Sequence, residues 1–148
     1  MRALITALVV ALAPAFAPAA DAATQVTLYK DPLCGCCAAY ADYLRDHGFA
    51  VTVIETEEID AAHARAGTPE GFEGCHLTMI EGYAVEGHVP VGAIAKLLAE
   101  RPAIVGLSVP GMPEGSPGMG GVADGPLTVY RFGATDGGDP APAPYAVE

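Results

Sequence analysis

Positive charge is scarce in this chain of 148 residues. Only seven residues are Lys or Arg, against 18 that are Asp or Glu, and the formal net charge is −11. Nucleic acids select for Lys and Arg along their phosphate backbone, so this composition argues against a nucleic-acid partner. An acidic surface is compatible with solubility and with cationic partners.

Long apolar runs are missing once the first 23 residues are set aside. Residues 1–23 read MRALITALVVALAPAFAPAADAA, with Arg2 at the start, an apolar stretch over 3–13, and small-residue A-x-A cleavage patterns after it. The apolar stretch is too short to span a membrane, and Pro14 and Pro18 follow it closely. We therefore expect residues 1–23 to be a secretory signal peptide of bacterial type rather than a membrane anchor, and the mature protein to be periplasmic.

The rest of the chain suits one compact domain, residues 24–136, with a Gly/Pro/Ala-rich tail at 137–148 that we expect to be disordered. The expected strands cover 25–29, 49–54, 77–80 and 83–85, and the expected helices cover 38–47, 59–66 and 91–100. This β-α-β-α-β-β-α order predicts an α/β, thioredoxin-like mixed sheet flanked by helices. Residues 106–125 are dense in Gly and Pro and predict an irregular loop, after which 127–132 can add an edge strand.

Cysteine is also sparse, but three of the four cysteines stand within four positions, in KDPLCGCC. Cys34 and Cys37 form a C-x-x-C at a strand-to-helix junction, where the helix N-terminus favours a thiolate. A thiolate is both a nucleophile and a metal ligand, so the location alone leaves a redox pair and a metal site open. Cys36 favours the metal site, because a third thiol beside a redox pair invites mispairing in an oxidising compartment.

Cys75 stands alone in sequence, directly before His76 and the third expected strand. In a thioredoxin-like fold this junction faces the C-x-x-C, at the place where a cis-proline usually stands, and no proline occupies it here. A cysteine there would aim its sulfur at the other three. The alternatives are a small buried apolar residue or a simple disulfide with one of the three. A shared site also requires residues 34–36 to lie in a loop or an irregular first turn, since Cys36 would point away on an ideal helix.

Charge and ligand softness indicate which metal four converging thiols would hold. Four thiolates around one Zn²⁺ leave a net charge of −2, whereas four Cu⁺ ions with four thiolates are neutral. Zinc sites usually use two separated C-x-x-C pairs, and the chain has one. The thioethers of Met112 and Met119 favour Cu(I) further, although methionine in such a loop can also serve as packing. We therefore predict Cu(I), with more than one ion per chain.

The four histidines differ in their expected roles. His76 adjoins Cys75, and His88 precedes a helix at the same end of the sheet, so both are candidate ligands or neighbours of the ligands. His47 and His63 are expected on solvated helix surfaces. A Cys–His catalytic dyad has no recognisable acyl-binding or oxyanion motif beside it, so no catalytic residue is assigned. Whether the protein is an enzyme stays open: a thiol–disulfide oxidoreductase using the C-x-x-C, or a catalyst of copper redox change, is the alternative to a binding protein.

Three segments together resemble the CopG-type periplasmic copper-resistance proteins, long described as a domain of unknown function. The segments are KDPLCGCC, GFEGCHLTMIEGYAVEGHVP and AKLLAERPAIVGLSVPGMPEGSPGM, and the resemblance runs from about Tyr29 to Phe132. One departure is Tyr40, where many relatives have Trp. The resemblance implies a thioredoxin-like fold, a cysteine-bound copper centre and a role in copper homeostasis, with copper ions and other periplasmic copper-handling proteins as partners. It matches Cys34, Cys36, Cys37 and Cys75 as copper-binding thiols, and His76, His88, Met112 and Met119 by motif.

Overall fold

The computed structural model describes residues 23–148, so the expected signal peptide lies outside the described residues except for Ala23. The elements follow in the order β1 (Gln25–Lys30), α1 (Gly35–Asp46), β2 (Ala50–Glu55), α2 (Ile59–Ala66), β3 (His76–Ile80), β4 (Tyr83–Glu86), α3 (Val91–Glu100), β5 (Gly106–Ser108), β6 (Thr128–Phe132) and β7 (Ala143–Val147). Within the described residues, no helix is both long enough and apolar enough to cross a membrane.

All seven strands belong to one mixed sheet, in the order β2-β1-β3-β4-β5-β6-β7. β1 pairs with β2 in parallel and with β3 antiparallel, and β3 and β4 form a hairpin through Glu81 and Gly82, both of which have positive φ. β5 then pairs with β4 in parallel, as a crossover through α3 requires. The first four strands and three helices confirm the predicted thioredoxin-like α/β fold, and β5 to β7 extend its sheet.

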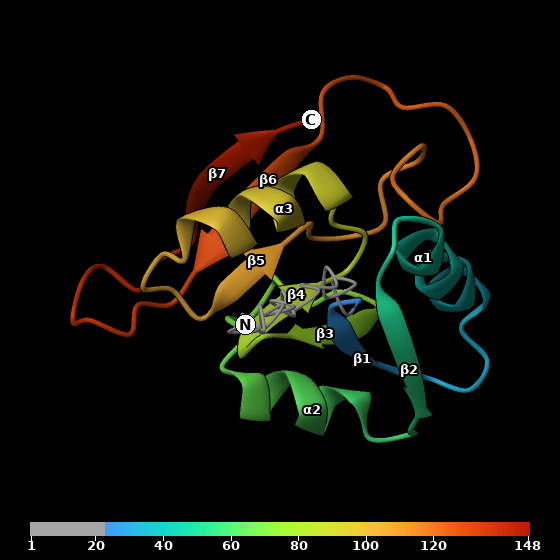
Figure 1. The fold of residues 1–148 in the computed structure, drawn as a ribbon, viewed down its shortest axis with the longest axis horizontal. Coiled ribbons are helices and arrows are strands. Elements are labelled where there is room, and N and C mark those ends of the chain that lie inside the picture. The colour runs from blue at the N-terminus through green and yellow to red at the C-terminus, as the bar shows by residue number, and fades with distance from the viewer. Residues whose placement is uncertain (1–22) are drawn as a thin grey trace, which may run out of the picture.

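The helices cover both faces of the sheet (Figure 1). α1 and α3 lie on one face, where Tyr40 and Leu44 of α1 and Ile94 and Leu97 of α3 belong to the larger apolar core. α2 lies on the other face, where Ala62 packs in a smaller core. Because side chains alternate along a strand, His76 at the start of β3 faces α1, and Glu86 at the end of β4 faces α2.

The C-terminal tail differs most from expectation. Residues 137–148, predicted to be disordered, include β7, which forms the true edge of the sheet and makes β6 an internal strand. Leu127 and Glu148 exchange two backbone hydrogen bonds, and the Tyr145 hydroxyl donates to Glu100 of α3. The composition misled the prediction because an edge strand pairs with one neighbour only and leaves its other side to solvent, so it tolerates proline. β5 likewise lies inside the segment predicted as loop.

α1 also begins three residues earlier than predicted, at Gly35 rather than Ala38. Cys34 is its N-cap, and the Cys34 sulfur accepts a hydrogen bond from the backbone N–H of Cys37. Cys36 and Cys37 therefore belong to the first turn of a regular helix, not to an irregular segment. The expectation that a shared site needs irregular backbone at 34–36 was wrong, because the N-cap residue already leaves helical geometry, with φ −76° and ψ 99°.

Candidate metal centre

Two strand ends bring the cysteines together. β1 and β3 pair antiparallel with Lys30 opposite His76, so the exit of β1 and the entry of β3 lie side by side. The chain leaving β1 reaches α1 through a short turn, in which the Cys34 N–H donates to the Asp31 carbonyl over 3.0 Å. Cys75 immediately precedes β3. The sheet register therefore places Cys75 opposite the N-terminus of α1, as the thioredoxin-like order predicts.

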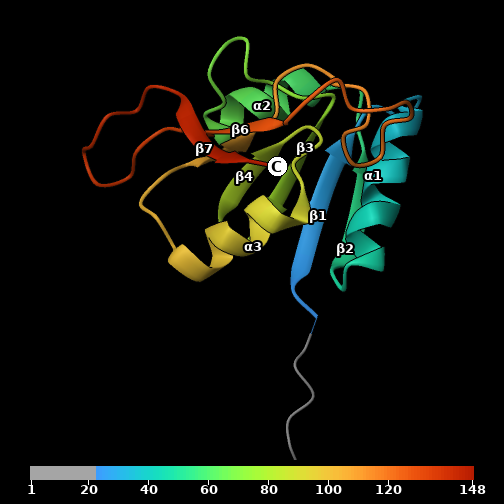
Figure 2. The same cartoon turned by 90° about the horizontal axis from the view of Figure 1, so that it is seen from above.

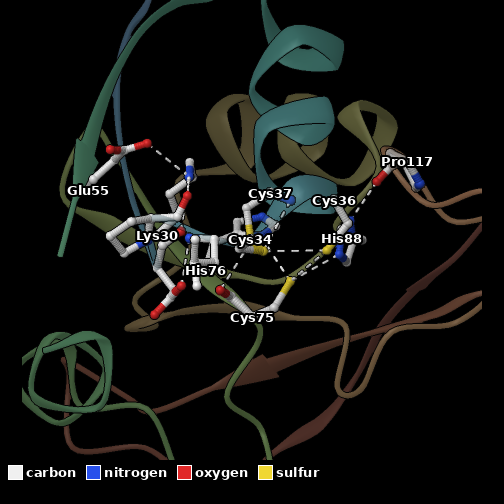
Figure 3. The surroundings of a disulfide bond; sticks show 12 residues. Lys30, Cys34, Cys36, Cys37, Glu55, Cys75, His76, His88 and Pro117 are labelled. Atoms are coloured by element: carbon white, nitrogen blue, oxygen red, sulfur yellow. Dashed lines mark hydrogen bonds and ion pairs between the residues drawn. A yellow bond between two sulfur atoms is a disulfide. The ribbon is translucent and has the colours of Figure 1, made fainter. Parts of the chain in front are cut away.

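The four sulfur atoms all lie within 4.8 Å of one another (Figure 3). Cys36 is central: its Sγ lies 3.5 Å from that of Cys34 and 3.7 Å from that of Cys75. Two thiolates on one tetrahedral metal lie about 3.8 Å apart when each metal–sulfur bond is about 2.3 Å. The spacings of Cys36 from Cys34 and from Cys75 are thus close to that of two ligands sharing a metal ion.

Cys34 and Cys37 form a disulfide in this structure, whereas Cys36 and Cys75 are free thiols. A disulfide sulfur carries no thiolate charge, so only the reduced pair can act as two strong metal ligands. Cys37 is fully buried, and its sulfur lies 3.2 Å from the carbonyl oxygen of Cys75. Reduction of this disulfide would supply the two further thiolates that a four-sulfur site requires.

Two histidines complete a second group around Cys75. His76 Nδ1 lies 3.3 Å and His88 Nε2 3.2 Å from the Cys75 sulfur. The other ring nitrogen of His88, Nδ1, lies 2.7 Å from the carbonyl oxygen of Pro117. A carbonyl only accepts, so Nδ1 carries the proton, and Nε2 presents its lone pair to the sulfur. His76 Nε2 is buried and has no hydrogen-bond partner among the described residues.

The protonation states suit binding of a soft cation. Burial lowers the pKa of His76 to about 3, assisted by the neighbouring His88, and burial also lowers the pKa of His88. Both rings are therefore neutral near pH 7 and can donate electron pairs. Burial raises the pKa of the Cys75 thiol to about 12, with the charge of Cys36 adding to the effect. A metal bound by Cys75 must therefore displace a proton.

Tyr40 forms a wall of the site. It is fully buried, its ring centroid lies 4.5 Å from that of His76 and 5.6 Å from that of His88, and its hydroxyl donates to the Val89 carbonyl over 2.7 Å. Burial raises the pKa of Tyr40 above its ordinary value, so the hydroxyl keeps its proton. The side chain thus fixes both imidazoles from the α1 side.

The two methionines lie in the loop after β5, where Met112 is 56% exposed and Met119 is half-buried. Their predicted ligand role therefore stays a prediction. His47 is exposed, as expected. The expectation for His63 was wrong. His63 is buried against the carboxylate of Glu86, because it lies on the face of α2 that packs on the sheet.

Sequence reasoning missed two buried ionic groups near the cysteines. Lys30 is 4% exposed, donates to the carbonyls of Asp31 and Pro32, and pairs with Glu55 over 3.1 Å (Figure 3). Its ammonium group therefore shapes the turn that leads into Cys34. Glu86 is fully buried on the opposite face of the sheet. The sequence signal for Lys30 and Glu86 is a charged residue at a strand position that faces the core. This signal can be recognised only when the ends of the strands are known.

Comparison with known proteins places this site in a family. A family described as "Protein of unknown function, DUF411" matches residues 72–119, the segment that carries Cys75, His76 and His88. Two solved structures, titled "Copper resistance protein copG- Form 2" and "Copper resistance protein copG- Form 1", are each 35% identical to this chain. Each match covers 85% of this chain and 98% of the other, with TM-scores of 0.76 and 0.75. No curated protein matches the chain.

A thioredoxin-like domain with four sulfurs gathered at the N-terminus of α1 defines a class of thiol-rich metal-binding proteins. Within that class, the chain belongs to the CopG-type copper-resistance family. The cysteine cluster and the family together give it a copper-related metal-binding role.

Proposed function

We propose that this protein binds Cu(I) through Cys34, Cys36, Cys37 and Cys75 as a periplasmic component of copper resistance. The observation that carries the proposal is the convergence of the four sulfurs within 4.8 Å from two separate segments. Soft thiolates suit Cu(I), and the neutral imidazoles beside Cys75 add nitrogen donors that copper also accepts. The periplasmic location rests on the leader-like residues 1–23.

The proposed stoichiometry is more than one Cu(I) per chain. Cys36 lies within 3.7 Å of both Cys34 and Cys75, so one sulfur can bridge two ions while each ion keeps two or more ligands. Sharing sulfurs in this way also neutralises the thiolate charge in a partly buried site. His76 and His88 lie on the Cys75 side and are proposed to ligate or orient the ion nearest to that sulfur.

An anaerobic titration tests the proposal. The fully reduced protein is titrated with Cu(I) against a chromogenic chelator of known affinity, and metal and thiol are counted in the isolated product. We expect saturation at more than one equivalent of copper, with all four thiols protected from alkylation. Saturation at one equivalent contradicts the shared-ligand site but leaves a mononuclear one, and failure to compete with the chelator contradicts the copper-binding function.

A second candidate function is thiol–disulfide exchange, and the Cys34–Cys37 disulfide is the observation that favours it. In that reaction the pair acts in its reduced form: one thiolate attacks a substrate disulfide, a substrate thiolate leaves, and the second thiol of the pair resolves the mixed disulfide, which reforms the Cys34–Cys37 disulfide and releases the reduced substrate. Cys36 and Cys75 are not needed for these steps. Reduction of insulin that persists in Cys36→Ser and Cys75→Ser would favour this function over copper binding.

A further inference from the structure

A fully buried carboxylate lies under the Cys75 segment, on the face of the sheet away from α1. Glu86 ends β4, and its side chain accepts hydrogen bonds from three donors. His63 Nδ1 lies 2.9 Å from both carboxylate oxygens, the Thr68 hydroxyl 2.5 Å from Oε1, and the backbone N–H of Gly74 3.2 Å from Oε2. None of these groups belongs to the two clusters that could hold a metal among the described residues.

The three donors come from one connection, which runs from α2 to the residue before Cys75. Glu86 therefore holds that connection against β4 at three points: His63 in α2, Thr68 after it, and Gly74 at the end. Gly74 is the last point: a Cβ added there would lie 2.2 Å from the backbone nitrogen of Gly87, so only glycine fits. On the other side of Cys75, the Gly87 N–H donates to the His76 carbonyl over 3.1 Å. The backbone is thus held on both sides of the cysteine.

The chemistry of the donors explains why a carboxylate stands here. Three N–H and O–H groups converge on two oxygens, and an ionised carboxylate accepts all three through its lone pairs. Burial lowers the pKa of His63, but its hydrogen bond to Glu86 and the charges of Glu86, Glu73 and Asp60 outweigh burial and raise it. In an amide, an NH₂ group would replace one of the two accepting oxygens. That NH₂ group would face a donor of the connection, and at least one of the three partners would lose its acceptor.

We propose that Glu86 is a positioning residue for the copper site: through Gly74 it fixes where the Cys75 sulfur stands opposite the N-terminus of α1. The inference rests on the proposed function for its meaning, because the cysteine being positioned is a proposed copper ligand. Glu86 itself does not touch the metal. Outer groups that orient ligands typically change metal affinity by about 10- to 100-fold when removed.

The test uses the full-length reduced protein and the variant Glu86→Gln. We expect Cu(I) affinity, measured by chelator competition, to fall by about 10- to 100-fold. Thr68→Val is a milder second variant, because it removes one donor without unpairing the buried charge, and it should lose less affinity. Ser108→Ala is the matched control: Ser108 is buried and donates to the Phe72 carbonyl of the same connection over 2.6 Å, but it does not bond the Gly74 peptide.

A second readout needs no copper. In the metal-free reduced protein, the Gly74 amide should exchange with solvent faster in Glu86→Gln and Thr68→Val than in wild type or Ser108→Ala. Lower affinity and faster Gly74 exchange in the first two variants alone support the proposal. Wild-type Cu(I) affinity in Glu86→Gln overturns the proposal. An equal loss of Cu(I) affinity in Ser108→Ala also overturns it, because the effect would then be a general loss of stability. If the wild-type protein takes up no Cu(I), the proposed function fails, and Gly74 exchange alone decides: unchanged exchange overturns the positioning role, and faster exchange upholds it.

Discussion

The imidazole of His88 joins the cysteine cluster to a loop far along the chain: Nδ1 donates to the Pro117 carbonyl, 2.7 Å away, while Nε2 faces the Cys75 sulfur at 3.2 Å. The same loop approaches α1, where a Cβ on Gly118 would lie 2.7 Å from the Tyr40 nitrogen. Figure 2 shows this Gly/Pro-rich segment passing beside the N-terminal end of α1. A segment without regular structure thus fixes the tautomer of a candidate ligand.

The four cysteines should behave as one unit in copper binding. Each single Cys→Ser variant at 34, 36, 37 or 75 should lose most of the copper capacity, because removing one bridging sulfur disrupts the ions it shares. Losses in double variants should be far from additive. Metal analysis after anaerobic loading checks this expectation. Undiminished copper in Cys75→Ser would contradict it and would restrict the site to the C-x-C-C segment.

His88 should contribute to affinity through its oriented lone pair. His88→Ala should weaken Cu(I) binding by about 10- to 100-fold, as loss of a ligand or of a group orienting one does. His47→Ala is the matched control, since His47 is exposed and its Nδ1 contacts only the Tyr43 carbonyl of its own helix. Chelator competition on the two variants gives the comparison. Equal affinities would show that His88 serves only to anchor the loop.

The His63–Glu86 pair should make stability depend on pH. The folded-state pKa of His63 is raised, so its stabilising contribution is fully present below the unfolded value of about 6.5 and disappears as pH rises through the folded value. The thermal midpoint of wild type should therefore exceed that of His63→Gln by more at about pH 5.5 than at about pH 9. Carboxylates at Glu73 and Asp60 act in the same direction. A gap that widens with rising pH would contradict this assignment.

The C-terminal strand should contribute to stability. Deleting residues 139–148 removes β7, its pairing with β6 and the contact of Tyr145 with α3, so the thermal midpoint should fall by about 5 °C or more. Tyr145→Phe is a control that removes only the hydroxyl bond to Glu100 and should cost little. Thermal denaturation followed by circular dichroism compares the variants. An unchanged midpoint would show that β7 adds no stability to the domain.

Local sequence patterns predicted some elements to the residue. α2 and α3 have the predicted bounds, because apolar positions at helical spacing begin and end where the packing does. The convergence of Cys75 with the other cysteines also followed from element order, since that order fixes which strand ends adjoin. α1 was misjudged at its start because a cysteine N-cap followed by Gly35 gives no helical signal.

The buried ionic pairs could not be read from the sequence. His63 and Glu86 lie 23 positions apart. The helical pattern of residues 59–66 does not show that His63 faces the end of β4. Lys30 directly follows the expected strand 25–29, and nothing in the sequence shows that it is buried under the turn to which it donates. Such partners are set by the packing of α2 and the register of β1, which form only in the complete fold.

The separation of the ligands along the chain has a consequence for how the domain assembles. Cys36 and Cys75 are 39 positions apart, so an ion bridging them closes a long loop of the chain. A covalent link of that span lowers the conformational entropy of the unfolded chain by an amount worth on the order of 4 kcal/mol, and a metal clip acts in the same sense. Copper bound between the N-terminus of α1 and Cys75 would therefore stabilise the native state by mass action. A chain in which β1 and β3 are not yet paired would hold copper with only the C-x-C-C half of the site.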